Sequence, residues 1–104
     1  MATTADVQPL LGYRELYELW ERQQWSVQDL DFTQDRVDWH ERFTPERRAA
    51  ERAEMGGFFL GEQRVTRELG PLLRAAADED VRLFLSTQIA DEARHVAFFD
   101  RFFA

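Results

Sequence analysis

The segment Asp91-Glu92-Ala93-Arg94-His95, together with Glu62, is the most informative part of this 104-residue sequence. Residues three apart on a helix project side by side, so Glu92 and His95 present a carboxylate and an imidazole on one face. The same predicted helix carries an apolar stripe in which Gln88, Glu92 and His95 lie, formed by Val81, Leu85, Ile89, Phe99 and Phe103. Polar groups within such a stripe need partners, because an unpaired buried charge is costly.

Glu62 holds a similar position on a second predicted helix. At 100° per residue, the apolar residues of that helix fall within roughly 80° either side of Glu62, namely Met55, Phe58, Phe59, Val65, Leu69, Leu72 and Leu73. Glu62 is therefore expected near the middle of a buried face, where it must be paired, protonated or bound to a metal. Carboxylates and neutral imidazole suit iron and manganese, and we interpret Glu62, Glu92 and His95 as metal ligands.

Each of these residues also has a simpler explanation. Glu-x-x-His is a weak motif in helical proteins, Glu92 could pair with Arg94 or Arg101 at the surface, and His95 could be a hydrogen-bonded core histidine. The coincidence of two apolar stripes favours metal ligation. Asp91 is either an acceptor that orients His95 or a solvated acid, and His40, in a short polar helix, is expected at the surface.

The rest of the pattern predicts an all-α fold. Helices are expected from Gly12 to Trp25, from a Thr33 N-cap to about Arg42, from Pro45 after a Thr44 N-cap to about Ala76, and from the acidic turn at residues 78–80 to the chain end. Residues 26–31 are interpreted as a connection, and Pro71 is expected to kink or break the long helix. Residues 1–10 are expected to be a flexible N-terminus, and residues 11–104 a partial helical domain.

Composition excludes several classes of function. The formal net charge of −7 argues against binding to nucleic acid or anionic membranes. The sequence contains no cysteine, which excludes disulfides, iron–sulfur clusters and thiolate zinc sites. No signal peptide is recognised, and no apolar run approaches the roughly 20 residues of a membrane span. A cytoplasmic location is the default expectation.

The ordered motifs resemble the small subunit of ribonucleotide reductase, and look closer still to the ligand-binding oxidases of related fold. The resemblance runs from Tyr13 onward through Trp25, the segment 31–39, Glu46-Arg47, the segment 61–66, Gln88, the segment 91–95 and Phe99. It implies a ferritin-like helical bundle, here its N-terminal half, with two long antiparallel helices and short N-terminal helices. Such bundles bind two metals with two sets of ligands, each a Glu and a Glu-x-x-His.

By that resemblance, Glu62, Glu92 and His95 are the first three of six ligands to an Fe/Fe or Mn/Fe pair. The implied partners are dioxygen and either a long-chain ligand or a partner subunit. Trp25 falls where the reductases carry a tryptophan of the electron-transfer route, although a buried aromatic between helices is an equal reading. Phe99 replaces the radical tyrosine of the common reductases, so a stored tyrosyl radical of that kind is not expected. Val65 matches a valine that the oxidases cross-link to a tyrosine from their second half, which this sequence does not contain.

The sequence holds one ligand set, and three interpretations follow. Truncation of a longer oxygen-activating oxidoreductase is favoured by the apolar end at Phe102-Phe103. Alternatively, a two-fold homodimer could combine two copies of Glu62, Glu92 and His95 into four carboxylates and two histidines. The chain could also be a non-catalytic metal-binding or assembly module, or an inactive remnant.

Overall fold

The computed structural model describes residues 8–104, and all regular secondary structure in this part of the chain is helical. The all-α prediction is therefore confirmed. The elements are α1 (Tyr13–Arg22), a 3-10 turn (Val27–Asp29), α2 (Thr33–Val37), a π-helical turn (Asp38–Arg42), α3 (Pro45–Ala75) and α4 (Glu79–Phe103). Most of the predicted flexible segment, residues 1–7, lies outside the described residues, and residues 8–10 are exposed without regular structure.

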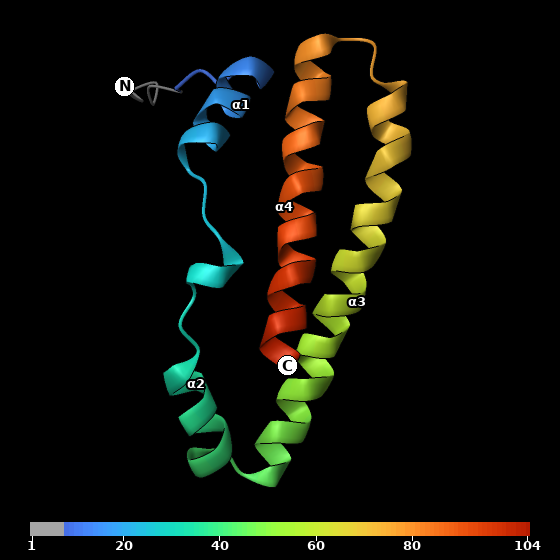
Figure 1. The fold of residues 1–104 in the computed structure, drawn as a ribbon. Coiled ribbons are helices and arrows are strands. Elements are labelled where there is room, and N and C mark those ends of the chain that lie inside the picture. The colour runs from blue at the N-terminus through green and yellow to red at the C-terminus, as the bar shows by residue number, and fades with distance from the viewer. Residues whose placement is uncertain (1–7) are drawn as a thin grey trace, which may run out of the picture.

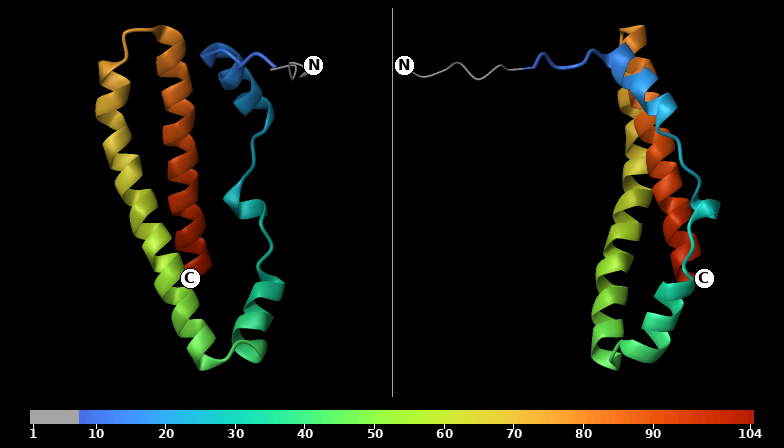
Figure 2. Two further views of the ribbon diagram at one scale, coloured as in Figure 1. Left: turned by 180° about the vertical axis from the view of Figure 1, so that it is seen from behind. Right: turned by 90° about the vertical axis from the view of Figure 1, so that its left-hand side faces the viewer.

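The long helices α3 and α4 form an antiparallel pair, and α1 packs against the other side of α4 (Figure 1). Seen from the side, these elements form a single thin layer (Figure 2), with extents of 52 × 46 × 24 Å. Helix α4 is therefore the central element, and it carries two of the three proposed ligands on a segment that both neighbours touch.

Short polar side chains set the beginnings of the two long helices, as the sequence predicts. The Thr44 hydroxyl accepts a hydrogen bond from the Arg47 backbone N–H at 3.1 Å. The Asp78 carboxylate accepts from the backbone N–H groups of Asp80 and Val81 at 2.8 and 3.4 Å. These bonds satisfy donors that the first turn of a helix leaves without partners.

Two predicted helix ends differ from the structure. Helix α1 ends at Arg22 rather than Trp25. Beyond its end, the side-chain amide of Gln24 donates to the Trp20 carbonyl, which would accept a backbone N–H if the helix continued. Thr33 is not the N-cap of α2 but its first residue. The Asp31 carboxylate accepts the Thr33 backbone N–H at 2.9 Å, and its hydrogen bonds with Thr33 lower the pKa of Asp31.

The expected break at Pro71 was wrong, because α3 continues through it to Ala75. Pro71 lacks a backbone N–H, but it is exposed and lies near the end of the helix, so few later turns depend on it. The Ala76 backbone N–H then bonds to the Leu72 carbonyl at 3.1 Å and completes the C-terminal turn.

The apolar stripe of α3 is less buried than the sequence indicates. Leu69 is 6% exposed, but Phe58 and Leu72 of the same stripe are 54% and 56% exposed. Within residues 8–104, α4 is the only element that packs extensively against α3, so the stripe residues turned away from α4 face solvent. Glu62 thus lies at the edge of the helix–helix contact rather than in the middle of a buried face.

Candidate metal centre

Glu62 of α3 and Glu92 and His95 of α4 converge at the contact between the two long helices. One potential ligand atom from each residue lies within 4.8 Å of the other two. The His95 Nδ1 atom is 3.3 Å from Glu62 Oε2 and 3.3 Å from Glu92 Oε2. All three side chains are partly buried, which limits competition from water without closing the group to an incoming ion.

The antiparallel pairing of α3 and α4 produces this arrangement. Glu92 and His95 are three residues apart on α4 and share the face turned toward α3. Glu62 and Glu92 also line an open cavity of about 480 Å³ with Glu54, Gly57, Phe58, Gly61 and Val65. A Cβ atom added at Gly57 or Gly61 would meet nothing within 4 Å. The ligand group therefore borders open space on one side of the layer.

The two carboxyl groups influence each other's protonation. A hydrogen bond with Glu92 is the main cause that lowers the pKa of Glu62, with further lowering by His95 against the opposing effect of burial. The same hydrogen bond raises the pKa of Glu92, and burial and the negative charge of Glu62 raise it further. Two carboxylates held this closely repel each other unless a proton or a cation lies between them.

The donor chemistry fits a hard or borderline divalent cation. Two carboxylate oxygens and one imidazole nitrogen are ligands that iron and manganese accept. The negative charge of the carboxylates would offset the positive charge of the metal. The group supplies three protein ligands, which is half of the set that a dinuclear carboxylate site uses.

Glu92→Gln should stabilise the metal-free chain at neutral pH while weakening metal binding. The pKa of Glu92 is raised in the folded chain, so protonated Glu92 stabilises the fold. This stabilisation is present below the ordinary pKa of 4.5 and is lost as pH rises through the raised pKa. Glutamine keeps a neutral group there at every pH, and we expect a gain of about 1 kcal/mol at pH 7.

Urea unfolding of the metal-free proteins checks this expectation. The gain should disappear near pH 4, where Glu92 is already protonated. Glu54→Gln is the matched control, because Glu54 lines the same cavity but lies outside the ligand group. Equal stability of Glu92→Gln and the wild type at both pH values would count against repulsion within the group.

Other residues singled out in the sequence have different surroundings. Asp91 makes no hydrogen bond to His95; its carboxylate instead accepts from the Trp20 indole N–H at 2.8 Å. Trp25 is 40% exposed and is not buried between helices. The Arg94 guanidinium lies 5.2 Å from the centre of its ring. His40 is exposed in the π-helical turn, as expected.

Phe99 is part of an aromatic cluster between α3 and α4. Phe99 is 9% exposed and its ring centre lies 6.1 Å from that of Phe59 on α3. Val65 lines the cavity that Glu62 and Glu92 share. Val65 therefore lies beside Glu62 and Glu92, and Phe99 follows His95 by about one turn of α4.

Trp20 is a residue of the site region that the sequence did not single out. In the sequence Trp20 shares the helical spacing of Leu16 and Leu19, which marks it only as an apolar residue of the first helix. Its indole N–H was the available signal, because a partly buried tryptophan usually finds a hydrogen-bond acceptor.

Comparison with known families is consistent with this geometry. The family model described as ribonucleotide reductase, small chain, matches residues 12–104. The chain therefore belongs to the ribonucleotide reductase small-chain family, and the predicted resemblance to that small subunit and the ferritin-like fold are confirmed. No solved structure was found to match the chain. Among the described residues, no helix is both long and apolar enough to cross a membrane.

Proposed function

We propose that this member of the ribonucleotide reductase small-chain family contributes Glu62, Glu92 and His95 as one half of a dinuclear metal site. The observation that carries the proposal is their convergence: donor atoms of two helices lie within 4.8 Å of one another, at residues that form one Glu plus Glu-x-x-His set. Members of the family typically bind a dinuclear metal. The Fe/Fe or Mn/Fe pair would supply the chemistry of dioxygen activation and substrate oxidation.

The chain's own residues would hold and shield the metals. Attraction of Glu62 and Glu92 to the cations would replace the repulsion between the two carboxylates. His95 would bind through the lone pair of Nδ1. Phe59 and Phe99 pack in tilted contact beside the ligands and would limit access of water from that end of the helix pair. The oxidised substrate would be a long-chain ligand or a partner subunit.

The remaining ligands must come from a second Glu and Glu-x-x-His set. A second copy of the chain is one source. Phe58, which lines the open cavity, and Leu72, further along α3, are exposed and offer an apolar surface for it. In such a homodimer the chain could serve as a non-catalytic metal-binding or assembly module. An inactive remnant would hold the three residues in place without binding metals tightly.

Anaerobic titration with Fe²⁺, with molar mass measured by light scattering, tests the proposal. Two metals per two chains with a doubled mass would support the symmetric site, and metal bound to single chains would support a half-site that needs another partner. Formation of new visible absorption on admission of oxygen would separate an oxidase from a passive metal-binding module. Absence of metal binding at millimolar Fe²⁺ would overturn the proposal.

Metal affinity should rise with pH. Protons compete with the metal for Glu62, Glu92 and His95, and the raised pKa of Glu92 extends this competition to higher pH than an ordinary glutamate would allow. We expect Mn²⁺ binding to strengthen by at least about tenfold between pH 5 and pH 7 and to release protons. Calorimetry in two buffers of different ionisation enthalpy measures that release. Binding that is independent of pH with no proton release would place the metal elsewhere.

A further inference from the structure

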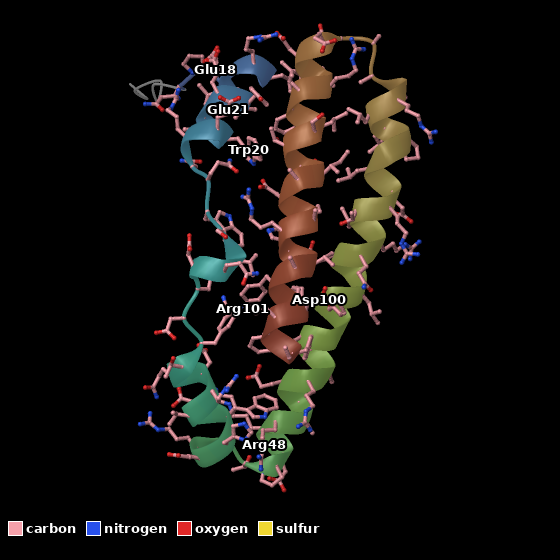
Figure 3. All side chains as sticks on the ribbon, in the orientation of Figure 1. Glu18, Trp20, Glu21, Arg48, Asp100 and Arg101 are labelled. Carbon is pink, nitrogen blue, oxygen red and sulfur yellow. The ribbon has the colours of Figure 1, made fainter. Side chains whose placement is uncertain are left out.

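Helix α1 is bound to α4 immediately beside the proposed ligands. The Trp20 Nε1–H donates to Asp91 Oδ1 at 2.8 Å in a partly buried contact between residues 71 positions apart. Figure 3 shows Trp20 reaching from α1 toward α4. An indole N–H bonded to a carboxylate is a charge-assisted hydrogen bond, which is stronger than one between neutral groups.

A second contact follows one turn later on α4. Arg94 donates to the side-chain oxygen of Gln24 at 2.6 Å, and it also lies 3.5 Å from the Asp91 carboxylate. The side chain of Arg94 is 19% exposed, whereas Gln24 is exposed, so this bond lies at the surface of the layer. The α1 side of the layer therefore holds α4 at two positions, Asp91 and Arg94.

These anchor residues alternate with the ligands along α4. Asp91 precedes Glu92, and Arg94 precedes His95. The anchors bond to α1 and the residues after it, while Glu92 and His95 face Glu62 on α3. One turn of α4 is thus held from one side and presents its ligands to the other.

We infer that Trp20 is a positioning residue for the metal site: through Asp91 it fixes the rotation of α4 about its axis and so aims Glu92 and His95 at Glu62. The inference rests on the proposed metal-binding function. A side-chain atom about 6 Å from a helix axis moves about 1 Å for each 10° of rotation. Metal–ligand distances tolerate only about 0.2 Å, so a small rotation is enough to weaken the site.

Co²⁺ binding to Trp20→Phe tests the inference, because the visible spectrum of Co²⁺ reports ligand geometry as well as affinity. Phenylalanine keeps an aromatic ring but removes the N–H donor. We expect affinity about tenfold weaker, the usual effect of losing a group that orients a ligand, together with a changed Co²⁺ spectrum. Trp39→Phe is the matched control, since Trp39 packs on Phe43 and Arg52 away from the ligands.

A double-mutant cycle with Asp91→Leu separates positioning from a general loss of stability. If Trp20 acts through Asp91, the double variant should bind Co²⁺ no more weakly than Asp91→Leu alone. Fully additive losses would overturn the inference. So would a Trp20→Phe protein with wild-type affinity and spectrum. Failure of the wild type to bind Co²⁺ would instead contradict the proposed function itself.

A fluorescence measurement on a chain that retains Trp20 covers the case in which Trp20→Phe does not fold. The sequence contains three tryptophans, so Trp25→Phe/Trp39→Phe leaves Trp20 as the sole indole emitter. Zn²⁺, which has no unpaired electrons to quench emission, should shift the Trp20 emission with the same midpoint as the calorimetric binding curve. Unchanged emission at saturating Zn²⁺ would contradict the coupling between Trp20 and the ligand turn.

Discussion

Glu62→Gln should weaken binding of Mn²⁺ or Co²⁺ by at least about 100-fold. Glutamine keeps the size and shape of the side chain but removes the negative charge that a divalent cation requires from its ligand. Glu62 is also the sole member of the group on α3, so its loss leaves a carboxylate and an imidazole from one turn of α4. Isothermal titration calorimetry measures the change directly.

The matched control is Glu54→Gln, which removes a carboxylate from the same helix and cavity. It should bind metal within about threefold of the wild type, because only long-range charge is lost. Similar losses in the two variants would indicate that general acidity, rather than the Glu62–Glu92–His95 geometry, attracts the ion. Wild-type affinity in Glu62→Gln would exclude Glu62 as a ligand.

Phe99→Ala should destabilise the folded chain by about 3 kcal/mol, the lower end of the range for truncating a buried phenylalanine. Phe99, at 9% exposed, is one of three buried apolar residues among the described residues. Its ring lies 5.1 Å from that of Phe98 and 6.4 Å from that of Phe103. Its removal would leave a cavity between α3 and α4 close to the proposed ligands.

Urea unfolding of the metal-free protein, followed by circular dichroism, gives the free energy. Phe58→Ala is the control, since Phe58 is 54% exposed on α3 and should lose less than about 1 kcal/mol. Equal effects at the two positions would indicate that the aromatic contacts around Phe99 do not form a core. Saturating metal should restore part of the lost stability by binding only the folded state.

Features set by local chemistry could be predicted from the sequence. Thr44 was predicted as the cap of the first long helix, and its side chain caps that helix. The second long helix was predicted to start from the acidic turn at residues 78–80, and Asp78 of that turn is its cap. Glu62, Glu92 and His95 could be selected because each interrupts an apolar stripe, and antiparallel pairing of the two helices then brings them together. Their role as metal ligands stays a prediction.

Features set by neighbouring elements could not be read from one helix at a time. The stripe around Glu62 indicated a buried face, but burial depends on how many elements cover α3, and Phe58 remains exposed. Asp91 was interpreted as either an acceptor that orients His95 or a solvated acid, whereas its carboxylate bonds to Trp20 on another helix. Pro71 was expected to kink or break α3, but the helix does not break there, because the cost of Pro71 depends on how much helix follows it.

Anomalous diffraction from crystals grown with Mn²⁺ is the most direct test of the metal centre. A peak bonded to Glu62, Glu92 and His95 Nδ1 is the expected result, and it should be absent in crystals of Glu62→Gln grown in the same way. Peaks confined to other surface carboxylates, with the His95 ring still hydrogen-bonded to Glu62 and Glu92, would contradict the assignment of these three residues as metal ligands.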